Sequence, residues 1–105
     1  MDTDEDYYDY YNPLTLEFDV IDLTAMGMQI QFYDDTNLAV IRPNTHGINI
    51  GSHVKIRYTG DKLLTTVDGI AKPDINITFT APFRIGFRIG AATYITYKNF
   101  IVYSE

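Results

Sequence analysis

The chain has 105 residues, enough for one domain with a modest hydrophobic core. Its 14 acidic residues outnumber its 8 basic ones, which argues against nucleic-acid binding, because that requires neutralised phosphates. The absence of cysteine excludes disulfides, thiol nucleophiles and cysteine-ligated metals. No apolar run reaches the ~18 residues of a membrane span, and the acidic start differs from a signal peptide, so we expect no membrane insertion.

The acidity is concentrated in residues 1–12, which hold five acidic side chains and no basic one. Like charges in so short a segment repel one another in a compact state. Four tyrosines in the same segment favour contacts with the rest of the chain or with a partner. We therefore expect an acidic, tyrosine-rich arm over residues 1–12, partly disordered, followed by a single domain over residues 13–105.

From residue 14 onward, β-branched and aromatic residues dominate, and no segment shows a sustained helical period. Turn residues divide this part of the chain into short runs. The pattern predicts nine strands, at residues 14–23, 28–33, 38–42, 47–50, 53–59, 62–67, 75–80, 83–89 and 94–103. Thr59-Gly60-Asp61 and Asp68-Gly69 are expected to close hairpins, and Pro73 to end the pairing that follows the second one.

Apolar and polar residues alternate along several of these strands, so that one face of each is apolar. Half-buried strands of this kind predict an all-β fold, a sandwich of two antiparallel sheets. The side chains expected to point into the core are Leu14, Leu16, Phe18, Val20, Met28, Ile30, Phe32, Val54, Ile56, Tyr58, Phe83, Ile85, Phe87 and Ile89.

Four segments together resemble the concanavalin A-like lectin/glucanase superfamily. They read HVKIRY (53–58), KLLTTVDG (62–69), FRIGFRI (83–89) and YKNFIVY (97–103), and residues 16–20 are similar to that family's opening strand. The resemblance implies a jelly-roll sandwich, often carbohydrate-binding, whose opening and closing strands pair. It also extends to short domains of phage tail, receptor-binding and microbial surface proteins, which implies a place on a virion or a cell surface.

The candidate ligand-binding residues are Arg84 and Arg88, which share one strand face about 13 Å apart with Gly86 between them. A guanidinium beside a flat glycine surface is suited to a sugar hydroxyl or to the carboxylate of an acidic glycan. Lys55 and Arg57 are expected to extend this basic face. The alternative is that both arginines simply pair with acidic side chains on neighbouring strands, such as Glu17 or Asp19.

Glu17, Asp19 and Asp22 resemble the E-x-D-x-x-E signature of laminarinase-type glycosidases, with Asp22 in place of the last glutamate. Such an enzyme needs a nucleophile and a general acid about 5–5.5 Å apart. The alternative places Glu17 and Asp19 on the solvated face of an ordinary strand, opposite Lys98. We expect the alternative, and hence no catalytic residues.

Two further groups have oxygen or nitrogen ligands that could serve a metal. Asp34, Asp35 and Asn37 offer oxygens for calcium but also make an ideal turn, and the spacing Asp2-x-Asp4-x-Asp6 lacks the rest of an EF-hand. His46 and His53 have no evident third ligand, so loop and surface positions are expected for them. We therefore expect neither a metal nor a cofactor.

These observations favour a non-enzymatic binding module whose ligand is a cell-surface carbohydrate. The alternative is a structural domain that makes protein–protein contacts in a virion or surface assembly, through the arm over residues 1–12 or through a sheet edge, including contacts with copies of itself.

Overall fold

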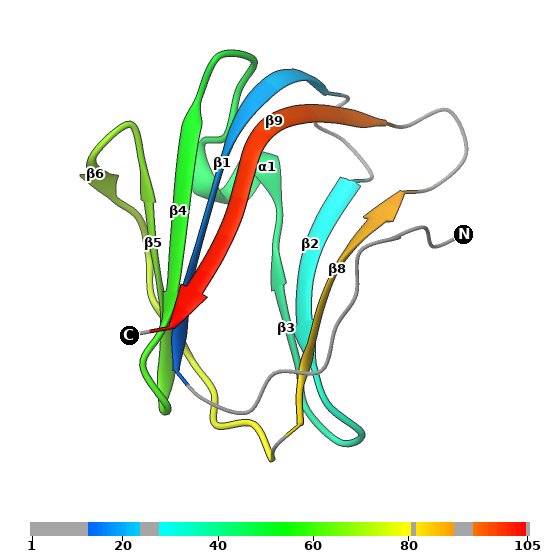
Figure 1. Cartoon of the computed structure of the whole chain (residues 1–105), viewed down its shortest axis with the longest axis vertical. Helices are drawn as coiled ribbons and strands as arrows, with labels where there is room; N and C mark the ends of the chain where they lie inside the picture. Colours follow the sequence, from blue (N-terminus) through cyan, green and yellow to red (C-terminus); the bar gives the residue numbers. More distant parts are fainter. Residues whose placement is uncertain (1–12, 24–27, 81, 90–93, 105) are drawn as a thin grey trace.

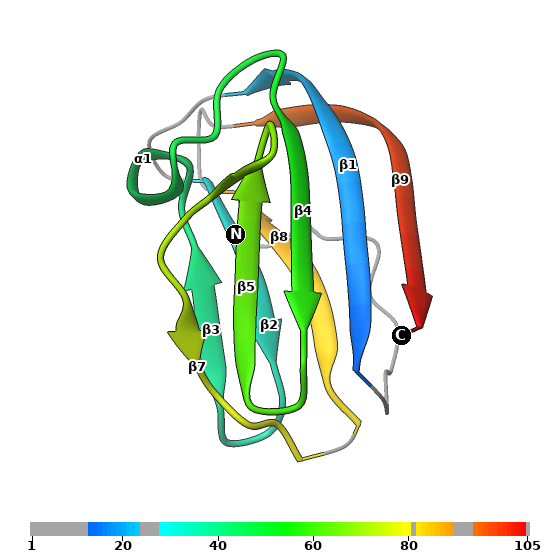
Figure 2. The ribbon, with the colours of Figure 1, turned by 90° about the vertical axis from the view of Figure 1, so that its left-hand side faces the viewer.

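The strands form two antiparallel sheets that pack against each other (Figures 1 and 2). The computed structural model describes residues 13–23, 28–80, 82–89 and 94–104, so the predicted arm lies outside the described residues. Within them, the large sheet has six strands, in the order β6-β5-β4-β1-β9 with β7 beside β5, and the small sheet has three, in the order β3-β2-β8. The elements are β1 (Leu14–Leu23), β2 (Met28–Tyr33), β3 (Leu38–Ile41), α1 (Pro43–His46), β4 (His53–Tyr58), β5 (Lys62–Val67), β6 (Ile70–Ala71), β7 (Ile75–Asn76), β8 (Arg84–Ile89) and β9 (Ile95–Ser104).

The core is built from alternate residues of both sheets, which confirms the all-β, two-sheet prediction. All the side chains predicted to point inward are buried, apart from that of Ile89, which lies outside what the structure describes. Phe18 of β1 connects the two sheets. Its ring centroid lies 5.7 Å from that of Phe87 in β8, and 5.9 and 6.2 Å from those of Tyr97 and Phe100 in β9.

Strand β1 lies between β4 and β9 and pairs with both. The pairing with β9 is the opening-to-closing contact that the family resemblance implied. Its register shifts between Glu17 and Asp19 and again between Val20 and Asp22. Both predicted hairpins are present, since β4 pairs with β5 and β5 with β6, and the β6 ladder ends before Pro73 as expected.

The prediction of a strand over residues 47–50 is wrong, because the structure has α1 and a turn between β3 and β4. Pro43 supplies the backbone φ of a first helical turn, and Gly47, at φ 67°, ends α1 in the left-handed conformation. The Ile48 N–H then donates to the Pro43 carbonyl, and residues 49–52 form a turn instead of a ladder. An alternation of apolar residues over so short a run cannot distinguish a strand from a turn with one side chain buried.

The strand predicted over residues 75–80 is also too long, because β7 ends at Asn76. Further along, the Phe79 N–H donates to the Tyr58 hydroxyl at 2.9 Å, and the Thr80 N–H donates to a carboxylate oxygen of Asp34 at 2.6 Å. Side chains thus satisfy backbone groups that a ladder would otherwise pair.

Candidate functional site

The outer face of the small sheet carries the two candidate arginines. The β2–β8 register places Tyr33 opposite Arg84, Gln31 opposite Gly86, and Gln29 opposite Arg88. Since neighbouring residues such as Phe32 and Ile85 are buried between the sheets, these six positions lie on the side of the sheet away from the core, although Gly86 itself is buried. We call them, together with the adjoining turn over residues 34–37, the small-sheet face.

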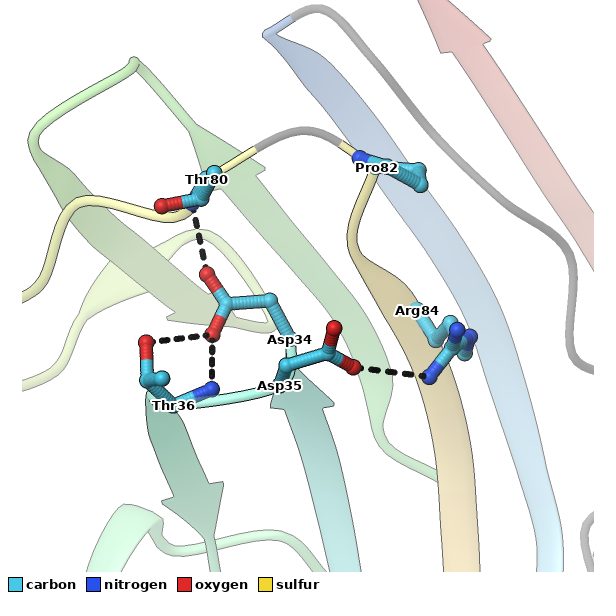
Figure 3. A pocket seen from close by; sticks show the side chains of 6 residues that line it. All are labelled: Asp34, Asp35, Thr36, Thr80, Pro82 and Arg84. Carbon is cyan, nitrogen blue, oxygen red and sulfur yellow. Dashed lines mark hydrogen bonds and ion pairs between the residues drawn. The ribbon is translucent and has the colours of Figure 1, made fainter.

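Arg84 is positioned by an aromatic ring and an acidic side chain. Its guanidinium carbon lies 6.0 Å from the centroid of the Tyr33 ring, within the range of a cation–π contact. One of its nitrogens lies 4.0 Å from an Asp35 carboxylate oxygen, and Figure 3 shows these two side chains pointing toward each other. The arrangement places a planar, charged guanidinium beside an aromatic ring.

The turn after β2 is built around the Asp34 carboxylate (Figure 3). It accepts hydrogen bonds from the backbone N–H groups of Thr36, Asn37 and Thr80 at 2.8, 2.6 and 2.6 Å, and from the Asn37 amide. Partial desolvation opposes ionisation, but these bonds outweigh it and hold the pKa of Asp34 well below its usual value. Both carboxylate oxygens are therefore committed to the turn.

The calcium alternative for Asp34, Asp35 and Asn37 gains no support from this geometry. The Asn37 amide directs its nitrogen, not its oxygen, toward Asp34. Across the described residues, no group of three or more His, Cys, Asp or Glu side chains is placed to share a metal ion. The spacing Asp2-x-Asp4-x-Asp6 lies outside the part of the chain that the structure describes.

Two hollows flank the turn on the small-sheet face. One, of about 270 Å³, is lined by Asp34, Asp35, Thr36, Thr80, Pro82 and Arg84. The other, of about 400 Å³, is lined by Gln31, Tyr33, Asp34, Asp35, Thr36, Asn37, Leu38 and Arg88. Arg84 and Arg88 thus each border a hollow, and Asp35 borders both.

Lys55 and Arg57 lie elsewhere. Both belong to β4 of the large sheet, where the intervening Val54, Ile56 and Tyr58 fill the core and both basic side chains are exposed. The outer faces of the two sheets point in opposite directions, so the expectation that Lys55 and Arg57 extend the surface of Arg84 and Arg88 is wrong. Alternation assigns a residue to a face of its own strand, but it does not say to which sheet that strand belongs.

The outer face of the large sheet carries a different group, the His53 cluster, which consists of His53, Glu17, Asp19, Tyr103 and Asn99. The His53 Nε2 lies 2.7 Å from Glu17 Oε1, and its Nδ1 lies 2.6 Å from Asp19 Oδ1. A neutral imidazole has only one N–H to donate. Both contacts are therefore satisfied only when His53 is protonated.

The carboxylates of this cluster are also held from β9. The Tyr103 hydroxyl donates to Glu17, and the Asn99 amide donates to Asp19 at 2.7 Å. Hydrogen bonds from Tyr103 and then His53 lower the pKa of Glu17, and those from Asn99 and then His53 lower that of Asp19. Conversely, bonds to Asp19 and Glu17 raise the pKa of His53. The cluster therefore connects β4, β1 and β9.

The three residues of the glycosidase-like signature, Glu17, Asp19 and Asp22, do not form a single cluster. Glu17 and Asp19 belong to the His53 cluster, and Asp19 is opposite Lys98 in the β1–β9 register, as the solvated-face alternative expected. Asp22 follows the second register shift, where it accepts hydrogen bonds from the Leu23 N–H and the Tyr94 hydroxyl. Glu17 and Asp19 bond to His53, whereas Arg84 lies near Asp35 in the other sheet.

Replacing His53 with glutamine is expected to change how stability depends on pH. A raised pKa in the folded state contributes stability that is fully present below the unfolded pKa of 6.5 and is lost as the pH rises through the folded pKa. We expect the free energy of unfolding of the wild-type protein to fall by up to about 1 kcal/mol as the pH rises, because exposed ion pairs contribute about that much. Urea unfolding at a series of pH values from about 5.5 to about 8.5 measures this loss of stability.

The matched control for this prediction is Lys62→Gln, because Lys62 is a basic residue of β5 and is not a member of the His53 cluster. The His53→Gln protein should lack the decline, and the Lys62→Gln protein should retain it. An identical pH profile in wild-type and His53→Gln proteins would contradict the role given to the cluster.

His46 occupies a different environment from the one predicted. It ends α1 and is 3% exposed, so the expectation of a loop or surface position is wrong. Neither ring nitrogen has a hydrogen-bond partner among the described residues. Burial lowers the pKa of His46, and the nearby carbonyls of Pro73 and Arg42 offset only part of that effect. The two histidines of the chain thus favour opposite protonation states.

No model of a known protein family matches the chain, and no curated protein matches it. The structure itself defines the class as an all-β fold of two antiparallel sheets. Among the described residues, no helix has the length and apolar character needed to cross a membrane.

Proposed function

We propose that this chain is a non-enzymatic carbohydrate-binding module whose ligand lies across the small-sheet face. The observation that carries the proposal is the placement of the Arg84 guanidinium over the Tyr33 ring, on the face that also carries Arg88. Guanidinium groups on one face suit a ligand that is rich in hydroxyl groups, because they donate several hydrogen bonds in a fixed plane.

The chemistry of the small-sheet face supports a polar ligand. Gln29 and Gln31 carry amide groups that are oriented by one hydrogen bond, in which the Gln31 amide nitrogen donates to Gln29 Oε1 at 2.9 Å. Arg88 extends the row of donors beyond Gly86 on the same face. Binding sites that select polar ligands commonly combine such fixed polar groups with an aromatic surface.

The family resemblance supports the same proposal. We propose that the fold is a short concanavalin A-like sandwich with jelly-roll connections, of the kind found in phage tail, receptor-binding and microbial surface proteins. The two antiparallel sheets and the β1–β9 pairing support this assignment. The same proposal includes a location on a virion or a cell surface, where such domains bind glycans.

The proposal is tested by a glycan screen, followed by calorimetry on the glycans that bind. Arg84→Ala and Arg88→Ala are each expected to weaken binding about 10- to 100-fold, because a hydrogen bond to a charged group contributes ~1.5–3 kcal/mol. Lys55→Ala and Arg57→Ala are the matched controls, since they remove the same charge from the opposite sheet, and both should bind as wild type does.

Binding that survives both arginine substitutions would remove the small-sheet face from consideration. If no glycan binds and sedimentation shows that the chain self-associates, the assembly role is favoured instead. Strand β9, which pairs only with β1 among the described residues and exposes Ile101 and Tyr103, is then the edge to test.

A further inference from the structure

We propose that the ligand is a sugar that carries an acetamido group, and that this group is recognised between Gln31 and Leu38. The inference rests on the proposed function and names the chemical class of the sugar. It starts from the hollow of about 400 Å³ on the small-sheet face, which is bordered by Gln31 of β2, Asn37 of the turn and Leu38 of β3.

Gln31 has an unused hydrogen-bond acceptor at this hollow. Its Nε2 donates to Gln29 Oε1 at 2.9 Å, and among the described residues no group donates to its own Oε1. The side chain is half-buried, so water reaches the amide from one side only. A ligand N–H that replaces that water forms a hydrogen bond in a partly enclosed place, where it contributes to affinity.

Asn37 adds a second acceptor to the same hollow. Its Nδ2 donates to both carboxylate oxygens of Asp34 and to the Thr36 hydroxyl. Because an ionised carboxylate only accepts hydrogen bonds, the orientation of this amide is fixed. The Asn37 Oδ1 receives no hydrogen bond within the part of the chain that the structure describes, and it suits a sugar hydroxyl.

Leu38 gives the hollow an apolar side. It is 57% exposed, whereas Ala39 and Ile41 of the same strand are buried. The β2–β3 register pairs Leu38 with Tyr33 and Val40 with Gln31, so Leu38 and Gln31 are diagonal neighbours on one face of the sheet. Diagonal neighbours have Cα atoms roughly 7–8 Å apart, which leaves room for a small group between their side chains.

An acetamido group has the shape and polarity that this pair of side chains requires. The amide is planar and trans, so its N–H and its methyl group lie on one edge, away from the carbonyl oxygen. A donor beside a methyl group is matched by an acceptor beside an apolar side chain, which is the arrangement of Gln31 and Leu38. Both are therefore specificity-determining residues: Gln31 for the N–H and Leu38 for the methyl group.

The experiment titrates the isotope-labelled full chain in NMR with four methyl glycosides that differ at one position. They carry an acetamido group (methyl N-acetylglucosaminide), an N-formyl group, an O-acetyl ester or a hydroxyl (methyl glucoside). The acetamido sugar is expected to bind tightest. Loss of the methyl group should weaken binding about 3- to 5-fold, and loss of the N–H about 2- to 10-fold. The hydroxyl compound lacks both and should bind about tenfold more weakly or worse.

Two variants assign each difference to its residue. Leu38→Ala should abolish the preference for acetyl over formyl and keep the preference for amide over ester. Gln31→Met, which keeps the length of the side chain but removes its acceptor, should do the reverse. Both should bind methyl glucoside as wild type does, which shows that the face is intact. Ile70→Ala is the control for Leu38→Ala, because Ile70 is 63% exposed and belongs to the large sheet, and it should leave all four affinities unchanged.

Each other outcome has a distinct meaning. If the acetamido sugar binds no tighter than methyl glucoside, the acetamido inference is overturned and the carbohydrate-binding proposal stands. A preference for the acetamido sugar that survives both Leu38→Ala and Gln31→Met also overturns the inference, because the group is then recognised elsewhere. If none of the four probes binds but another glycan of the screen does, only the inference fails. If no probe and no glycan binds, both proposals fail.

Discussion

Replacing Phe18 with alanine is expected to lower the free energy of unfolding by about 3–5 kcal/mol. Phe18 is fully buried and is the side chain of β1 whose ring meets Phe87 of the small sheet as well as Tyr97 and Phe100 of β9. Its removal leaves a cavity at the point where the two sheets meet, and an apolar cavity between sheets cannot be filled without moving a strand. Urea unfolding followed by far-ultraviolet circular dichroism measures the loss.

The loss is a large part of the total stability of a domain of this size, which is of order 5–15 kcal/mol. Ile70→Ala is the matched control, because Ile70 is a large apolar side chain that is 63% exposed. Its substitution should change stability by no more than about 0.5 kcal/mol. A loss below about 1 kcal/mol for Phe18→Ala would mean that this ring does not join the sheets.

Replacing His46 with leucine is expected to remove most of the acid sensitivity between pH 6.5 and about 5. Because burial lowers the folded pKa of His46, the unfolded chain binds its proton more readily. Stability contributed by the neutral ring is therefore present above the unfolded pKa of 6.5 and declines as the pH falls toward the folded value. The slope reaches at most about 1.4 kcal/mol for each pH unit.

The same substitution removes two ring nitrogens that have no hydrogen-bond partner among the described residues, so the His46→Leu protein should be no less stable than wild type at neutral pH. Urea midpoints measured from neutral to acidic pH give the slopes of both proteins. His53→Gln serves as the contrast, since His53 acts in the opposite direction. A His46→Leu protein that loses stability on acidification as steeply as wild type would refute the assignment.

Period-two alternation predicted the architecture because it reports directly which side chains must avoid water. Phe83, Ile85 and Phe87 could be assigned to the core in this way, and so could the outward position of Arg84. The short helix α1 escaped prediction because four residues are too few to show a helical period. Pro43 followed four residues later by Gly47 was the available signal, since proline favours a first helical turn and glycine the residue after the last.

The sites were less predictable, because they depend on contacts between strands. His53 is 36 residues from Glu17 and 34 from Asp19, and nothing in this spacing indicates that β1 and β4 pair so that Asp19 stands opposite His53. Lys55 and Arg57 were misplaced for the same reason. The turn at Asp34 was predictable from its residue types, whereas the contact between Asp35 and Arg84 required the β2–β8 register.

The pairing of β1 with β9 also has a consequence for how the chain reaches its native state. Asn99 and Asp19, which are hydrogen-bonded across these strands, are 80 residues apart. Closing a loop of that length is slow compared with forming the local hairpins. During synthesis, β1 is made long before β9. Until β9 is made, one edge of β1 has no strand to pair with. Completion of the large sheet therefore depends on β9, which is made after the other described strands.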